Sequence, residues 1–363
     1  IYIDSSMIDY QKKRYVHAIE QYETIFCPDK VAIFSAPGRS EVCGNHTDHQ
    51  HGMVLATSIN LDTIAVSAKN NNDVVRFVSD GYDMITLDIN DLEVNNDEAG
   101  TTVSLIRGVL RGLKDHGYKI GGFNAYATSD VLVGAGLSSS AAFEVVVGTI
   151  ISGLYNDMKI NSVEIAQISQ YAENVFFKKP CGLMDQMACS VGGMVNIDFK
   201  DPTKPIVKKV PTEFEKYDYS LCIVDTKGDH VDLTDDYAMI PSEMKKVANF
   251  LGEDYLRDCD SNEFYIRLDE IREAVGDRPV LRAIHFFNEE YNVKNAVSSL
   301  ENGKFVEFLD AIRKSGNSSF KYLQNVYTTR DIQHQNISVA LALSESLLRN
   351  YGVCRVHGGG FAG

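Results

Sequence analysis

Apolar residues recur along this chain with two different spacings, one typical of helices and the other typical of strands. Residues 7–26 are predicted to form a helix, because apolar residues recur there at helical spacing among charged neighbours. These apolar residues are Ile8, Tyr15, Ile19 and Tyr22. The apolar run VAIFS predicts a buried strand over 31–35, which ends where a polar, glycine-containing stretch begins. The chain is therefore expected to open with a helix and then a strand.

Several short strands are expected after the polar stretch. Turn signals at 70–73 and 80–81 separate runs of strand-forming residues, which predicts a β-meander. Its three strands are expected over 54–67, 74–79 and 84–89. Residues 90–101 are acidic and polar and are expected to form a loop.

The middle of the chain is predicted to hold three helices and one strand. FNAYATS alternates as a strand over 123–129, and the helical patterns cover 102–117, 140–154 and 162–177. Asn161 and Glu164 have the spacing of a capping box at the start of the last of these helices.

A second domain is predicted to begin near residue 200. The segment ProThrLysPro at 202–205 is the best linker candidate. Beyond it, strands are expected over 219–225 and 352–356, with helices through much of 240–350. The order of elements favours an α+β class with two domains, at 1–200 and 201–363.

Composition and charge narrow the function classes. The chain has 363 residues, 44% of them hydrophobic and 23% charged, which is typical of a globular protein. Its formal net charge of −15 disfavours nucleic acid or an anionic membrane as the main partner. Seven scattered cysteines without a C-x-x-C pair favour reduced thiols in the cytoplasm over a zinc knuckle. No stretch resembles a signal peptide or a membrane span, and the missing initial Met suggests that N-terminal residues precede Ile1.

The stretch VLVGAGLSSSAAFEV at 131–145 is the first candidate for chemistry. Glycine and serine between a strand and a helix let backbone N–H groups approach a phosphate, so the pattern predicts a phosphate cradle. A tight turn with capping serines is the structural alternative. A Walker A loop is excluded because Gly303-Lys304 precedes Phe, and a dinucleotide fingerprint is disfavoured because Ser139 stands at its third glycine.

The stretch SAPGRSEVCGNHTDHQHG at 35–52 is the second candidate. Arg39 could neutralise charge on a phosphoryl group, and Asp48 could accept hydrogen bonds from the hydroxyls of a sugar. A histidine metal cluster and a solvated loop are the alternatives that the residues leave open.

Four stretches together resemble the GHMP kinase superfamily and, within it, the galactokinases. Residues 36–52 are similar to the galactokinase signature, 133–145 to the superfamily's ATP-binding loop and 357–363 to its C-terminal glycine-rich motif. PCGLMDQMA at 180–188 is similar to the galactokinase segment that carries the catalytic aspartate. The resemblance implies a two-domain GHMP kinase fold. Its N-terminal domain would resemble domain 2 of ribosomal protein S5, and its C-terminal domain would be a ferredoxin-like α/β domain that appears truncated after the third motif.

The same resemblance implies ATP-dependent phosphorylation of the C1 hydroxyl of galactose, with Mg²⁺ as cofactor, and assigns a role to individual residues. The catalytic pair would be Arg39 and Asp185. The ATP-binding residues would be Gly134, Ala135, Gly136, Leu137, Ser138, Ser139 and Ser140. The sugar-binding residues would be Asn45, His46, Asp48, Gly182, Asp185 and Tyr237. Ser140 and Glu173 would bind Mg²⁺, although the helical pattern alone fits a rim salt bridge at Glu173 equally well.

The first motif departs from the family pattern G-R-x-N-x-x-G-E-H. Glu41 stands at the family's Asn, and Asn45 stands at the Glu that accepts a hydrogen bond from the sugar's C6 hydroxyl. An uncharged amide accepts more weakly, which leaves N-acetylgalactosamine or arabinose open as substrates. A third hypothesis is a galactokinase-like sugar sensor without catalysis, which the intact second motif disfavours.

Overall fold

The structure is a computed structural model that describes residues 2, 5–27, 30–132, 136–212, 214–228 and 234–361. The chain forms two compact units. The first comprises the described residues of Ile1–Arg39, Ser58–Val133 and Leu137–Gly192, and the second those of Ser40–Thr57, Gly134–Gly136 and Gly193–Gly363. The boundary at residue 200 stays a prediction.

A twisted sheet forms the frame of the first unit. β5 (Phe123–Ser129) lies between β2 (Met53–Lys69) and β3 (Val74–Ser79), and β4 (Ile85–Asp88) pairs with β3. β5 is antiparallel to β2 and parallel to β3. The strands match the predicted ranges, but the meander is wrong, because β5 separates β2 from β3. A parallel pair needs a crossover, and the chain makes it through α2 (Thr102–Asp115).

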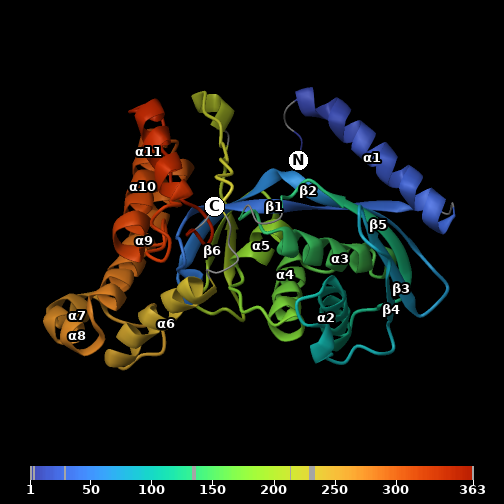
Figure 1. Cartoon of the computed structure of the whole chain (residues 1–363), viewed down its shortest axis with the longest axis horizontal. Coiled ribbons are helices and arrows are strands. Elements are labelled where there is room, and N and C mark those ends of the chain that lie inside the picture. The colour runs from blue at the N-terminus through green and yellow to red at the C-terminus, as the bar shows by residue number, and fades with distance from the viewer. Residues whose placement is uncertain are drawn as a thin grey trace. The chain divides into compact units, whose positions relative to one another are not determined.

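Helices cover both faces of this sheet (Figure 1). α1 (Ser5–Phe26) packs Ala18 and Tyr22 against Ile64, Val66 and Tyr126 of the strands. On the other face lie α2, α3 (Ser139–Tyr155) and α4 (Ser162–Tyr171). Near them lie a π-helical turn η3 (Ala172–Phe177) and α5 (Met184–Val191).

The predicted helices of this unit are confirmed, and the last of them changes character at its end. The helix expected over 162–177 is an α-helix to Tyr171 and a π-helix beyond it. Asn161 caps it by accepting from the N–H of Val163 at 2.8 Å. Glu164, the other member of the predicted capping box, accepts a hydrogen bond from the Tyr118 hydroxyl at 2.7 Å.

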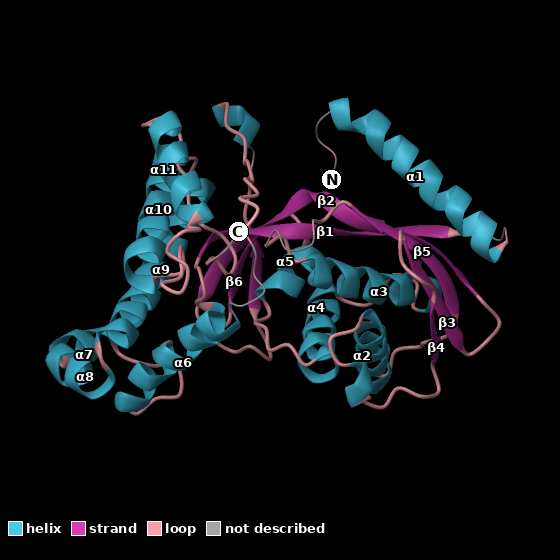
Figure 2. Ribbon diagram, in the orientation of Figure 1, coloured by secondary structure: helices cyan, strands magenta, loops and turns pink. Residues whose placement is uncertain are grey.

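The second unit has a small antiparallel sheet and many helices (Figure 2). β6 (Met194–Asp198) pairs with Met53–Thr57 at the start of β2 and with β7 (Ile206–Lys209). The strand predicted at 31–35 belongs to the longer β1 (Ala32–Cys43), which runs through both units. The helices are α6 (Thr234–Phe250), α7 (Ser261–Ile266), α8 (Leu268–Val275), α9 (Asp277–Glu301), α10 (Phe305–Ser318), the π-helical turn η5 (Ser319–Leu323) and α11 (Asn336–Leu348).

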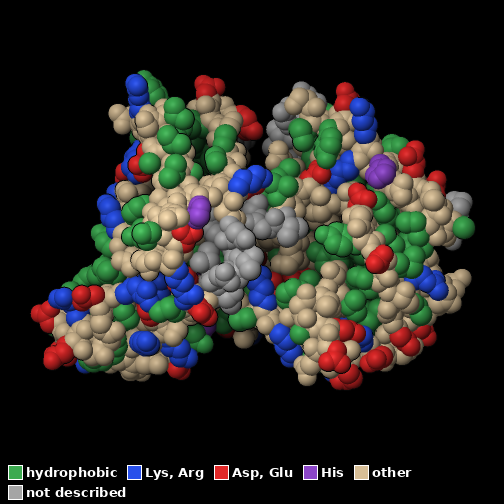
Figure 3. Space-filling view, viewed as in Figure 1, with side chains coloured by type: hydrophobic (Ala, Val, Ile, Leu, Met, Phe, Trp, Pro, Cys, Tyr) green, Lys and Arg blue, Asp and Glu red, His purple; other side chains and the backbone are tan. Residues whose placement is uncertain are grey.

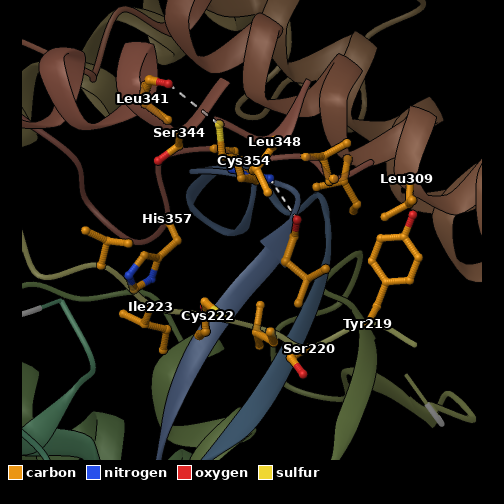
Figure 4. Close-up of a pocket in the computed structure, with 18 of the residues that line it drawn as sticks. Tyr219, Ser220, Cys222, Ile223, Leu309, Leu341, Ser344, Leu348, Cys354 and His357 are labelled. Atoms are coloured by element: carbon orange, nitrogen blue, oxygen red, sulfur yellow. Dashed lines mark hydrogen bonds between the residues drawn. The ribbon is translucent and has the colours of Figure 1, made fainter. Parts of the chain in front are cut away.

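The strands predicted at 219–225 and 352–356 are wrong. Both segments are irregular and pair with no strand among the described residues. They line an apolar cavity of about 870 Å³ together with α10 and α11 (Figure 4). Leu221 and Val224 of the first segment are exposed, and a strand also needs a neighbouring backbone to pair with.

Charges of both signs are interspersed over the end of the second unit that α7 and α8 form (Figure 3). Arg267, for example, pairs with Glu263 and Glu270 on the same surface. Within the described ranges, no helix combines the length and the apolar character that a bilayer crossing requires.

Candidate active site

The loop that leads into α3 lies close against β1 in the first unit. The N–H of Arg39 donates to the carbonyl of Leu137 at 3.2 Å. A Cβ at Gly38 would meet that carbonyl oxygen at 2.9 Å, so the close approach requires glycine there. Gly136 has a φ of +68°. Gly134 and Ala135, which the sequence assigned to ATP binding, lie outside the described residues.

Ser138 is the N-cap of α3 and adopts the left-handed conformation, with φ of 59°. Its side chain does not cap the helix, because the hydroxyl donates to Asp185 Oδ2 at 2.5 Å. The first-turn N–H groups at Ser139 and Ser140 are therefore not capped by Ser138. A helix N-terminus of this kind carries partial positive charge and suits a phosphate.

Asp185 is held by two donors in the first turn of α5. Its Oδ1 accepts from Arg39 Nε at 2.8 Å, opposite the Oδ2 that Ser138 holds. Burial by itself would raise the pKa of Asp185, but the charge and hydrogen bond of Arg39 and the Ser138 hydroxyl outweigh it and lower that pKa. The Asp185 side chain keeps 32% of its surface exposed, so an ionised carboxylate remains accessible.

Glu173 lies in the π-helical turn with its side chain 3% exposed. Its Oε1 accepts from Ser140 Oγ at 3.1 Å and from Lys179 Nζ at 3.0 Å. Its Oε2 accepts from Gln186 Nε2 at 2.7 Å. The structure thus brings together Ser140 and Glu173, the two residues that the sequence assigned to a metal.

Glu144, Lys179 and Gln186 are functional candidates that the sequence interpretation missed. Gln186 Nε2 also lies 3.2 Å from Glu144 Oε2, and burial, followed by the charge of Glu173, raises the pKa of Glu144. Glu144 stands four residues after Ser140 on α3, the spacing that puts two side chains on one helix face, and that spacing could have revealed it.

The donor set at Glu173 fits Mg²⁺. A carboxylate and a hydroxyl are hard oxygen ligands, and Mg²⁺ is commonly held by one or two carboxylates together with substrate phosphates. No group of three or more His, Cys, Asp or Glu side chains that could hold a metal occurs in the described part of the chain.

Gly182 precedes α5 in a segment fixed by its neighbours. The N–H of Cys181 donates to Asn174 Oδ1 at 2.7 Å, and Gln170 Nε2 donates to the carbonyl of Cys181 at 3.1 Å. These bonds set the position of Gly182 and of the helix turn that carries Asp185.

In the second unit, the polar groups of Asn45 are engaged by the protein itself. Its Nδ2 donates to Glu41 Oε2 at 2.8 Å and to the carbonyl of Gly358 at 2.7 Å. Its Oδ1 accepts from Asn325 Nδ2 at 2.7 Å, and the residue is fully buried. Glu41 and Asn45, which are exchanged relative to the family pattern, therefore contact each other.

Glu41 also forms a buried ion pair with Arg355, with 3.0 Å between Oε1 and Nη2. The two side chains are 1% and 6% exposed. Arg355 donates further to Ser315 Oγ at 2.6 Å and to the carbonyl of Val42 at 3.0 Å. The pair therefore ties β1 to α10 and to the segment before the glycine-rich motif.

His46 and Tyr237 both contact the glycine-rich segment 358–360. His46 Nε2 lies 3.1 Å from the carbonyl of Gly359, and the Tyr237 hydroxyl donates to Gly360 at 2.7 Å. Burial, followed by the charge of His49, lowers the pKa of His46 to about 3, so its ring is neutral near pH 7. Asp48 starts a 3-10 turn and accepts from the N–H of His49 at 3.0 Å.

Comparison with known proteins first identifies the class of protein to which this chain belongs. The family model described as "GHMP kinases N terminal domain" matches residues 104–193, and "Galactokinase galactose-binding signature" matches 20–69. A crystal structure of Methanococcus jannaschii mevalonate kinase superposes with a TM-score of 0.56 at 16% identity, over 92% of this chain and 89% of that one. The fold is that of a GHMP kinase.

The family within that class follows from closer relatives. A galactokinase of Limosilactobacillus reuteri is 30% identical over 359 residues, covering 95% of this chain and 87% of the relative. A Streptomyces coelicolor galactokinase is 28% identical over 351 residues, covering 95% and 86%. A crystal structure of Lactococcus lactis galactokinase complexed with galactose has a TM-score of 0.81 at 23% identity, covering 96% and 88%. The chain belongs to the galactokinase family, and the resemblance found in its motifs is confirmed.

Proposed function

We propose that this protein transfers the γ-phosphoryl group of ATP to the C1 hydroxyl of galactose. The observation that carries the proposal is the set formed by Arg39, Asp185 and Ser138 beside the N-terminus of α3. Its support comes from membership of the galactokinase family, whose relatives carry that activity in their name.

Asp185 would orient the sugar hydroxyl and accept its proton. Phosphoryl transfer through a loose transition state asks mainly for positioning and charge neutralisation. The lowered pKa of Asp185 keeps it ionised, which suits an anchor that holds the hydroxyl by a charge-assisted hydrogen bond. Arg39, with its side chain 5% exposed, would neutralise negative charge on the transferring group.

The nucleotide phosphates would lie at the start of α3. Gly136, Leu137, Ser138, Ser139 and Ser140 provide backbone N–H groups there, next to the undescribed Gly134 and Ala135. Ser140 and Glu173 would hold Mg²⁺, which when bound supplies positive charge to the β- and γ-phosphates.

The predicted sugar-binding residues differ in whether their polar groups are already hydrogen-bonded to the protein. His46 and Asp48 are the candidates for hydroxyl binding, and Gly182 would allow close approach beside Asp185. The side-chain bonds of Asn45 and the hydroxyl bond of Tyr237 favour a role in fixing the glycine-rich segment. We also propose a cytoplasmic location, which the seven free cysteines support.

A coupled ADP-release assay with galactose, glucose, N-acetylgalactosamine and arabinose tests this function. We expect galactose to give the highest kcat/KM and to raise ADP release well above the rate without sugar. A higher kcat/KM for N-acetylgalactosamine or arabinose would replace galactose as the substrate. No sugar-dependent ADP release with any of them would contradict the kinase assignment and favour the sensor hypothesis.

A further inference from the structure

Lys179 contacts the carboxylate of Glu173, which we assign to Mg²⁺ binding. Its Nζ lies 3.0 Å from Glu173 Oε1, the same oxygen that accepts from Ser140 Oγ at 3.1 Å. The ammonium group thus sits at the pair of ligands proposed for the metal. Neither the composition of the second motif nor the helical pattern pointed to this lysine.

A tight turn after η3 places Lys179 there. Lys178 adopts the left-handed conformation with φ of 67°, and the N–H of Lys179 donates back to the carbonyl of Glu173 at 3.1 Å. This reversal returns the chain to the residue six positions earlier. The side chain of Lys179 then reaches the Glu173 carboxylate.

The two oxygens of Glu173 differ in how readily they can change partner. Oε2 is held by Gln186, which is fully buried and also lies against Glu144. Oε1 is held by Ser140 and by Lys179, whose side chain is 60% exposed. Of the two partners, the exposed Lys179 has room to move away from the carboxylate, and the buried Gln186 does not.

We propose that Lys179 is a built-in cation for the Glu173–Ser140 site, which neutralises Glu173 while no metal is bound and is exchanged for Mg²⁺ when the nucleotide binds. This inference rests on the metal site of the proposed function. Mg²⁺ binds carboxylate oxygen at about 2.1 Å, so the ion and the ammonium group would compete for one oxygen and repel each other. Lys179 therefore weakens metal binding and raises the Mg²⁺ concentration that the site requires.

Calorimetric titration of a non-hydrolysable ATP analogue at increasing Mg²⁺ concentrations tests the exchange. We expect Lys179→Met to lower the half-saturating Mg²⁺ concentration about fivefold, the factor that corresponds to about 1 kcal/mol for a partly exposed ion pair. Lys179→Arg keeps the charge and should retain the wild-type Mg²⁺ requirement. Lys178→Met is the matched control, since it removes the same charge one residue away, and it should also behave as wild type.

An unchanged or raised Mg²⁺ requirement in Lys179→Met would overturn the inference, and a raised one would make Lys179 a phosphate ligand instead. Glu173→Gln separates this failure from failure of the proposed site. If Glu173→Gln raises the Mg²⁺ requirement while Lys179→Met has no effect, the metal site stands and the exchange does not. If Glu173→Gln changes nothing, the metal site itself is wrong. Lys179→Gln provides the same test if Lys179→Met does not fold.

Discussion

At the residue scale, the candidate site depends on side chains that hold one another. Arg39, Ser138 and Asp185 are separated in sequence by up to 146 positions and still form one hydrogen-bonded group. The motifs predicted that these three residues would matter. They could not predict that Ser138 would bind Asp185, because that contact depends on how α3 and α5 pack.

The Ser138 hydroxyl offers a direct test at this scale. We expect Ser138→Ala to lower kcat about tenfold or more, because a hydrogen bond to a charged group is worth about 1.5–3 kcal/mol. Ser190→Ala is the control in the same helix as Asp185, since the hydroxyl of Ser190 donates only to the carbonyl of Ser162. Steady-state kinetics with saturating ATP would measure both. Equal kcat values in the two variants would contradict the role of Ser138.

The backbone of Ser138 gives a separate expectation. The left-handed conformation costs an L-residue with a Cβ about 1–2 kcal/mol, and glycine avoids that cost. Ser138→Gly should therefore be more stable towards urea than Ser138→Ala by about 1 kcal/mol, while its kcat is as low. Equal stability of the two variants would show that this conformation carries no cost.

At the scale of elements, the local pattern of apolar residues predicted helices and strands correctly where their formation did not depend on pairing with distant parts of the chain. The helix over 102–117 and the strand over 123–129 were confirmed because their apolar residues lie on a face that is buried. The segments 219–225 and 352–356 have a similar apolar character and are not strands. The predicted strand order was wrong for the same reason, since β5 pairs with β2 and β3 from a distant part of the chain.

The Glu41–Arg355 pair shows how a buried contact connects elements. Arg355→Met removes the charged partner of a buried carboxylate, and loss of one member of such a pair costs about 3–5 kcal/mol. We expect urea unfolding to show a destabilisation of that size. Arg272→Met, which breaks the exposed pair with Asp277, should change the free energy of unfolding by less than about 1 kcal/mol. Similar losses in both variants would contradict the assigned burial of the pair.

At the scale of the whole molecule, the predicted site residues divide between the two compact units. Those for phosphoryl transfer and metal binding, Arg39, Ser138, Ser140, Glu173 and Asp185, belong to the first unit. Those for sugar binding other than Gly182 and Asp185, namely Asn45, His46, Asp48 and Tyr237, belong to the second. The linear motifs predicted these residues but not their division between the two units, because β1 carries residues of both units on one strand.

Buried histidines of the second unit should make the stability of the protein depend on pH. Burial lowers the pKa of His46 and of His285, which lies 2.8 Å from the carbonyl of Asn45. The unfolded chain binds protons at these two histidines below about pH 6.5, and the folded state binds fewer because their pKa values are lowered there. The free energy of unfolding should therefore fall as pH drops below about 6.5, by up to about 1.4 kcal/mol per pH unit for each histidine.

The variant His285→Gln isolates one of these contributions. Its free energy of unfolding should fall less steeply than that of the wild type between about pH 6.5 and pH 5, because one proton-binding group is removed from the unfolded state. Urea unfolding at several pH values would measure the difference in slope. Parallel curves for the variant and the wild type would mean that His285 is charged in the folded protein.

The central claim is that an ionised Asp185, held by Arg39 and Ser138, acts directly on the sugar hydroxyl that receives the phosphoryl group. The most direct measurement is the single-turnover rate of galactose phosphorylation by Asp185→Asn, which keeps the shape of the side chain and removes its charge. The account predicts a rate lower by about 10²–10⁴-fold, with binding of the ATP analogue retained. A single-turnover rate close to that of the wild type would contradict it.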